Sequence, residues 1–147
     1  FRALHKAGFA NHPNSLSIDD GLKLHEAIIT AAARCAPPDN KPTRQEFANC
    51  SEYLDWEFDH LAKAIVYLAL GKIAFDGTYA LLQARGLTLP ARARPIFGHG
   101  VRVALAGGRV LLASFHPSQQ NTFTGKLTEP MFDAVFNEAR KLIGHTR

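Results

Sequence analysis

A histidine stands at the end of an apolar stretch of the chain, in the run His116-Pro117-Ser118. An imidazole can donate a hydrogen bond, and hydroxyl and amide groups can hold a phosphate or read the edge of a base. This combination favours a site that grips a sugar-phosphate backbone. On position alone, the plainer interpretation that His116 only caps a turn stays open. The residues that follow are polar, with one glycine and one lysine at the end: Gln119, Gln120, Asn121, Thr122, Thr124, Gly125 and Lys126.

The segment that must position His116 is the apolar run Val110–Phe115. A short continuous apolar run bounded by turn residues predicts a strand buried on both faces of a sheet. In open α/β sheets, ligands bind at the loops that leave the carboxyl ends of such strands. The pattern therefore predicts that His116 lies at a ligand-binding edge.

Two stretches of the chain resemble one known family. Residues Leu112–Leu127 resemble the C-terminal signature of the uracil-DNA glycosylase superfamily, whose shared core is His-Pro-Ser. The extension Gln119–Leu127 resembles the type-B, iron–sulfur branch (family five) of that superfamily, as does the second block Thr30–Thr43, and Cys50 fits as well. The resemblance implies a DNA repair glycosylase, a hydrolase that flips uracil or another deaminated base out of DNA and hydrolyses its N-glycosidic bond.

The resemblance also implies roles for individual residues. His116 would donate to the base oxygen where negative charge develops, and Asn40 would contact the flipped nucleotide in the active site. Gln120 stands where many relatives place an apolar wedge, so amides would fill the gap left by the base. The water-positioning residue would belong to a motif upstream of Phe1. The residues expected to contact DNA or the base are Pro117, Ser118, Gln119, Gln120, Asn121, Gly125 and Lys126.

The chain contains two cysteines, Cys35 and Cys50. Taken by themselves they could be inert buried thiols, because free cysteine is commonly buried and a cluster takes four thiolates. The resemblance implies instead that both bind a 4Fe-4S cluster. Its two further ligands would come from a Cys-x-x-Cys upstream of Phe1.

The composition is that of one soluble globular domain covering residues 1–147, with 46% hydrophobic and 20% charged residues. No apolar run is long enough to span a membrane, and we expect a cytoplasmic monomer. Two cysteines without a signal peptide favour a reducing compartment. The formal charge of +4 is compatible with a polyanionic partner such as DNA.

Strand and helix patterns alternate along the chain. We expect one strand ending near Arg34, another strand with its exit loop at residues 64–72 and a hairpin that turns at Gly107-Gly108. Helices are expected at residues 73–83 and, opened by Thr128, up to Gly144. This order predicts a three-layer α/β/α sandwich with a mainly parallel sheet.

The chain opens on Phe1 in what reads as a helix, and its only methionine is Met131. We therefore expect an N-terminal part, including the first strand of the sheet, to precede this sequence. Residues 1–147 alone are then expected to be unstable and inactive, because strand edges would be left without partners.

Several cations and one further histidine have weaker signals. A phosphate-facing role and a solvated surface are both open for Arg34, Lys41, Arg92, Arg94 and Lys126, and the last is favoured by its place beside Gly125. His99, between two glycines, indicates close backbone packing and not catalysis. Two alternatives to the glycosylase stay open: a truncated, non-catalytic paralogue that binds DNA, and an enzyme that binds the phosphate of free nucleotides.

Overall fold

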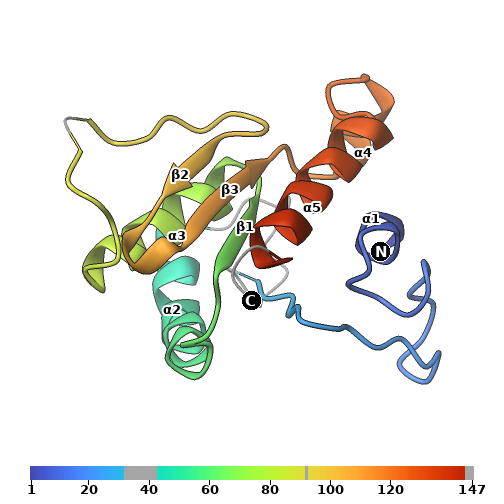
Figure 1. Ribbon diagram of the computed structural model, residues 1–147, viewed down its shortest axis with the longest axis horizontal. Coiled ribbons are helices and arrows are strands. Elements are labelled where there is room, and N and C mark those ends of the chain that lie inside the picture. The colour runs from blue at the N-terminus through green and yellow to red at the C-terminus, as the bar shows by residue number, and fades with distance from the viewer. Residues whose placement is uncertain (32–42, 92, 145–147) are drawn as a thin grey trace. The chain divides into compact units, whose positions relative to one another are not determined.

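A computed structural model describes residues 1–31, 43–91 and 93–144 of the chain. The chain divides into two compact units (Figure 1). Unit 1 consists of residues 1–28 and 65–147, and unit 2 of residues 29–64. His116 belongs to unit 1, so the elements of that unit position it.

The sheet of unit 1 has the strand order β1-β3-β2, with β1 at Val66–Leu70, β2 at Arg102–Ala104 and β3 at Val110–Ser114. β1 runs parallel to β3, with Leu70 opposite Ser114. β2 pairs with β3 in antiparallel fashion around the turn at residues 106–108. All five residues of β3 are buried, as expected of a central strand covered on both faces.

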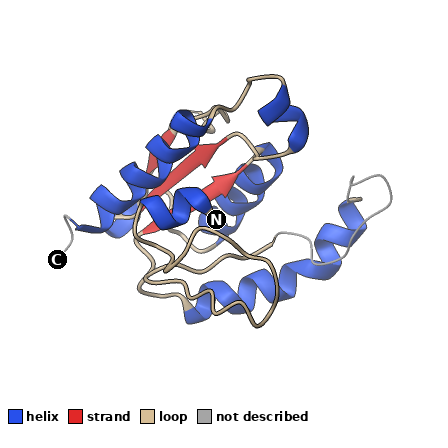
Figure 2. Ribbon diagram, turned by 90° about the vertical axis from the view of Figure 1, so that its right-hand side faces the viewer, coloured by secondary structure: helices blue, strands red, loops and turns tan. Residues whose placement is uncertain are grey.

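Helices cover both faces of this sheet (Figures 1 and 2). α3 (Lys72–Ala84) packs against β1, and α5 (Glu129–Gly144) packs against β3 and β1. Successive side chains of a strand point to opposite faces. The α/β class and the layered architecture are confirmed. The sheet is mixed and not mainly parallel, because the β2–β3 hairpin adds an antiparallel edge.

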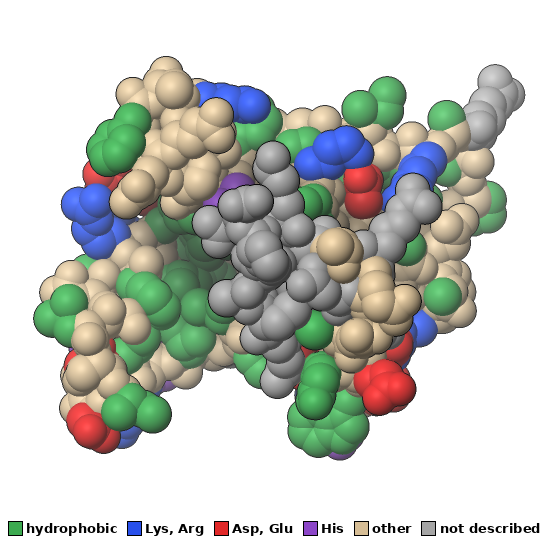
Figure 3. Space-filling view, turned by 180° about the vertical axis from the view of Figure 1, so that it is seen from behind, with side chains coloured by type: hydrophobic (Ala, Val, Ile, Leu, Met, Phe, Trp, Pro, Cys, Tyr) green, Lys and Arg blue, Asp and Glu red, His purple; other side chains and the backbone are tan. Residues whose placement is uncertain are grey.

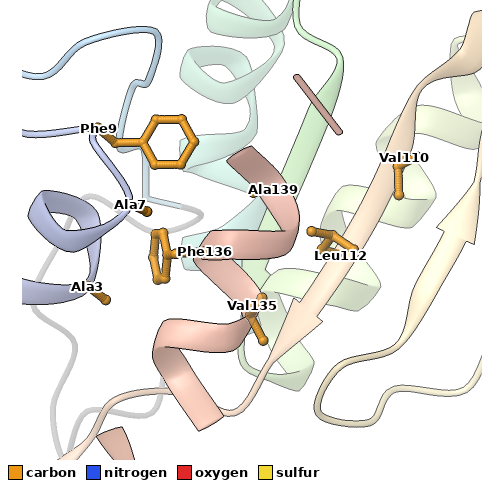
Figure 4. Close-up of a cluster of buried hydrophobic side chains, with 8 residues drawn as sticks. All are labelled: Ala3, Ala7, Phe9, Val110, Leu112, Val135, Phe136 and Ala139. Carbon is orange, nitrogen blue, oxygen red and sulfur yellow. The ribbon is translucent and has the colours of Figure 1, made fainter. Parts of the chain in front are cut away.

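The core between β3 and α5 also includes the N-terminal segment, which begins with α1 (Arg2–Lys6). Figure 4 shows side chains of α1 and its following turn, of α5 and of β3 in this cluster. Burial of these apolar side chains is the main stabilising term for the packing of the three elements. The buried members of the cluster are Ala3, Ala7, Phe9, Val110, Leu112, Val135, Phe136 and Ala139.

Charged side chains hold the N-terminal segment on α5. Lys6 Nζ lies 2.6 Å from Glu129 Oε1 and 2.7 Å from Asp133 Oδ2. Arg140 donates to the carbonyl oxygens of Ala7 (2.9 Å) and Gly8 (2.6 Å). Residues 1–8 are thus tied to the last helix of the chain by hydrogen bonds as well as by burial.

In unit 2, helix α2 (Arg44–His60) is the main element. It begins directly after Thr43. Cys50 is buried on this helix with 8% of its surface exposed. Near its end the rings of Trp56 and His60 stack with centroids 3.9 Å apart.

The strand predicted to end near Arg34 is wrong for its described part. Residues 27–31 form no strand, and residues 32–42 lie outside the described residues. A strand exists only where a neighbour accepts its hydrogen bonds. Within the described ranges no strand pairs with residues 27–31 or with the second edge of β1.

In the described part of the chain, none of the helices is both long and apolar enough to cross a bilayer.

Candidate active site at the carboxyl end of the sheet

The carboxyl ends of the parallel strands β1 and β3 open at the same edge of the sheet. Gly71 follows β1 and Phe115 follows β3. The amide of Gly71 donates to the carbonyl oxygen of Ser114 at 2.8 Å, which joins the two strand ends. Ser114 itself is fully buried. The backbone that leads into His116 is therefore held at the ends of both strands.

His116 is held in place through its backbone. Its carbonyl oxygen accepts a hydrogen bond from Asn121 Nδ2 at 2.8 Å. Gly71 packs so closely that a Cβ at position 71 would lie 3.2 Å from the His116 Cβ. The His116 side chain is exposed, and no described residue hydrogen-bonds to its ring. As far as the described residues are concerned, both ring nitrogens are thus available to a ligand.

The polar loop after His116 contains a short helix that the sequence did not predict, α4 (Gln119–Phe123). Ser118 caps it, because its Oγ accepts from the amide of Asn121 at 3.3 Å. Thr122 Oγ1 donates to the carbonyl oxygen of Ser118 at 3.1 Å. Hydrogen bonds from four polar side chains therefore stabilise the loop itself, those of Ser118, Asn121, Thr122 and Thr124, whereas Gln119 and Gln120 are exposed.

The loop returns to the fold through Leu127, which is buried and whose amide donates to the carbonyl oxygen of Asn121 at 2.9 Å. Before it, Gly125 adopts a positive φ of 71°, a conformation that suits glycine. Lys126 Nζ lies 5.0 Å from the centroid of the Phe115 ring. This cation–π contact places a positive charge beside the strand end that precedes His116.

A second group of charges lies where α3 begins. Lys72 and Arg94 both pair with Asp76, and Arg94 also donates to the carbonyl oxygen of Asp76 at 3.1 Å. These three residues line a surface cavity of about 310 Å³ together with Pro95, Ile96 and Phe97. Because Lys72 follows Gly71, this cavity begins next to the loop that contacts His116.

Hydrophobic side chains also reach solvent at several separate places, which the space-filling view illustrates for one face (Figure 3). The side chain of Phe123 at the end of α4 is 85% exposed, as is that of Ile96. Single exposed hydrophobic residues are common on protein surfaces. They do not by themselves define a site.

Hydrogen bonds shift pKa values in the N-terminal loop and at the contact between α1 and α5. The amides of Leu22 and Leu16 donate to Asp20 and lower the pKa of its carboxyl group. Hydrogen bonds to Asp133 and Glu129 raise the pKa of Lys6, and Lys6 in turn lowers the pKa of Glu129. These shifts belong to the N-terminal loop and to the α1–α5 contact, where the hydrogen bonds that cause them stabilise the structure.

Comparison with known proteins identifies the family. The family model described as "Uracil DNA glycosylase superfamily" matches residues 1–140. The chain belongs to this superfamily. The resemblance read from His116-Pro117-Ser118 and its neighbours is thereby confirmed.

Three relatives of this chain share one description, "Type-5 uracil-DNA glycosylase". The protein of Mycobacterium tuberculosis is 46% identical over 148 residues, which cover 98% of this chain and 52% of the relative. That of Thermus thermophilus is 48% identical over 141 residues, covering 96% and 61%. That of Pyrobaculum aerophilum is 41% identical over 139 residues, covering 95% and 57%. The chain thus spans about half to three-fifths of the length of these relatives.

The structure brings together only part of the predicted site of this superfamily member. Residues 117–126 follow His116 on one continuous loop, in which Asn121 donates to the His116 carbonyl oxygen. Five of the predicted residues lie outside the described part of the chain: Arg34, Cys35, Asn40, Lys41 and Arg92. Cys50 lies in unit 2, whereas His116 lies in unit 1. Within the described residues no group of three or more metal-ligating side chains converges.

Sequence reasoning missed the part that His99 plays at this edge. Its Nδ1 lies 3.3 Å from the amide nitrogen of Phe115, the residue before His116. The two residues are separated along the chain by the whole β2–β3 hairpin, so no local pattern indicates the contact. The only signal was the pair of flanking glycines, which predicted close backbone packing.

Proposed function

We propose that the chain carries the base-departure half of a uracil-DNA glycosylase active site. The observation that supports this most directly is His116, which is fixed through its backbone while its ring stays exposed. An imidazole held in this way needs little rearrangement when it binds a ligand. A preorganised donor of this kind stabilises negative charge as it develops in a transition state.

The reaction hydrolyses the N-glycosidic bond between a deaminated base and its deoxyribose. The base must leave the stack before this bond can be reached. As the bond breaks, positive charge builds on the sugar and negative charge on the departing base. His116 donates a hydrogen bond to the base oxygen at this point. The positively charged Lys126 beside Phe115 and the exposed amides of Gln119 and Gln120 contact the DNA around it.

In this proposal, Ser118 and Asn121 act by shaping the loop and not by direct side-chain contact with DNA. Their side chains already serve the loop, as the cap of α4 and as the anchor of the His116 carbonyl group. We infer that both shape the loop so that main-chain amides meet a phosphate, as at other helix N-terminal loops. Pro117 and Gly125 fix the two turns of the same loop. Asn40 is proposed to contact the flipped nucleotide, on the strength of the family resemblance.

A His116→Ala substitution tests the proposed function. In protein that releases uracil, the rate of uracil release from a uracil-containing oligonucleotide should fall roughly a hundred- to a thousandfold. DNA affinity should change little, because phosphate contacts supply most of it. His5→Ala, an exposed histidine of α1, is the matched control. Wild-type turnover by the His116 variant would refute the assignment, and DNA binding without any uracil release by the unmodified protein would favour a non-catalytic DNA-binding paralogue.

An iron–sulfur cluster is the second part of the proposal. Four thiolates typically hold such a cluster, and this chain offers two, Cys35 and Cys50. Burial of Cys50 on α2 suits a ligand shielded from solvent. When bound, the cluster would cross-link the segments that supply its ligands. Either residue, replaced by serine, should abolish the absorbance near about 400 nm that thiolate-to-iron charge transfer gives. Unchanged iron and sulfide content in the double variant would show that the two are ordinary thiols.

A further inference from the structure

The loop at residues 97–101 runs beside the end of β3 and is attached to it by main-chain hydrogen bonds. The amide of Gly100 donates to the carbonyl oxygen of Ala113 at 2.8 Å, and the amide of Ala113 donates to that of Val101 at 2.9 Å. Gly100 has a positive φ of 75°, which lets the chain turn at this point. His99 is thus delivered to the strand end by a fixed backbone and not by a free loop.

Beyond these main-chain hydrogen bonds, the ring of His99 makes the next contact with the end of β3. Its Nδ1 accepts from the amide of Phe115 at 3.3 Å and lies 3.4 Å from Ser114 Oγ. The Ser114 hydroxyl donates to the carbonyl oxygen of Phe115 at 2.9 Å. Because Nδ1 receives an N–H group, it must carry a lone pair, so the proton of neutral His99 lies on Nε2.

These contacts complete a set of anchors around His116. On one side, the carbonyl group of Ser114 is held by Gly71, and on the other, the carbonyl group of His116 is held by Asn121. Phe115 N–H is the last main-chain donor before His116, and His99 is its acceptor. We propose that His99 is a positioning residue for His116, acting through the amide of Phe115. This inference rests on the proposed function, in which His116 meets the departing base.

Packing alone offers a different explanation for His99. Its ring lies 5.2 Å from that of Phe115, which in turn lies 6.1 Å from Phe97. If His99 only filled this aromatic cluster, an apolar side chain of similar size would replace it. If it accepts from Phe115, a polar replacement with an acceptor at the place of Nδ1 would replace it instead. The two roles therefore predict opposite orders for two substitutions.

His99→Asn and His99→Leu make this comparison, because the asparagine Oδ1 takes nearly the place of Nδ1 and leucine keeps the apolar bulk. For uracil release, kcat of His99→Leu should fall by roughly ten- to a hundredfold, since misplacing a reacting group by about 1 Å can cost about a hundredfold. KM should change little in both variants. His99→Asn should keep kcat within about threefold of the wild type, because it restores the acceptor. The reverse order, an active leucine and an impaired asparagine variant, would overturn the proposal.

A measurement on the unsubstituted protein keeps the proposal testable if the leucine variant fails to fold. Two-dimensional ¹⁵N–¹H spectra of the imidazole distinguish the two neutral tautomers of His99. The expected result is the tautomer with hydrogen on Nε2, and hydrogen on Nδ1 in the neutral ring would overturn the inference. His116→Ala separates the two levels: full activity of that variant refutes the proposed function. Loss of activity there, with wild-type kcat for His99→Leu, refutes only the role of His99.

Discussion

Gly71 offers the sharpest test of how the fold positions His116. It precedes α3 with φ 97° and ψ 164°, a combination that is essentially confined to glycine. An alanine at this position would have to adopt the same conformation, because the Gly71 amide is bonded to Ser114 and α3 starts at the next residue. The unfavourable backbone conformation should therefore strain the Gly71→Ala variant and lower its free energy of unfolding by about 1–3 kcal/mol.

The same substitution should disturb the site through a second term. The new methyl carbon would lie 3.2 Å from the His116 Cβ, so one of the two must move by a few tenths of an ångström. If about 1 Å of misplacement costs about a hundredfold in rate, a shift of about 0.3 Å costs about fourfold on a logarithmic scale. We therefore expect kcat for uracil release to fall on the order of three- to tenfold, with little change in KM.

Gly77 provides the matched control. It lies inside α3, and apart from its chain neighbours and the backbone of its own helix, no atom of the described residues lies within 4 Å of where its Cβ would be. Gly77→Ala should raise the free energy of unfolding by about 0.5–1 kcal/mol, because alanine is the better helix former. Denaturant unfolding and single-turnover uracil release, measured on both variants, check the two terms separately. A Gly71→Ala protein as stable and as active as the wild type would refute the reasoning.

Three further predictions concern the core, the DNA contact and the N-terminal loop. Leu112→Ala should lower the free energy of unfolding by about 2–5 kcal/mol, because the side chain is buried between β3 and α5; Leu16→Ala, at a position 85% exposed, should change it by less than about 0.5 kcal/mol. Lys126→Ala should weaken DNA binding and reduce the slope of log K against log salt by about 1, while Lys23→Ala should not. Asp20→Asn should lower the thermal midpoint at neutral pH but not in acid: a carboxyl group whose pKa is lowered from 3.8 by folding stabilises above that value and loses its effect as pH falls through the folded pKa.

The sequence predicted best those elements whose signals are local. The continuous apolar run of β3 and the hydroxyl residue Thr128 before α5 predicted those elements nearly in their observed bounds. The Gly-Gly turn likewise identified the β2–β3 hairpin. Hydrophobic periodicity and cap residues act over a few positions, so these features can be read without knowing the fold.

Features that depend on distant partners were missed. The strand expected before Arg34 is absent at residues 27–31, because an apolar run becomes a strand only beside a suitable neighbour. The five-residue helix α4 is too short for a periodic pattern, and it forms because Ser118 caps it. His99 was interpreted as a packing residue since its contact with Phe115 spans a hairpin.

The way His116 is held also explains why the surrounding residues are so varied in type. A side chain that must meet a ligand cannot spend its own ring nitrogens on anchoring, so the backbone on either side has to be fixed instead. Here a glycine, a histidine and an asparagine from three separate segments do this, through close packing, an acceptor nitrogen and a donor amide. None of the three needs to touch DNA for its loss to slow the reaction. Substitutions around such a site should therefore lower kcat much more than they raise KM, and their effects should not add, because all act on the position of one imidazole.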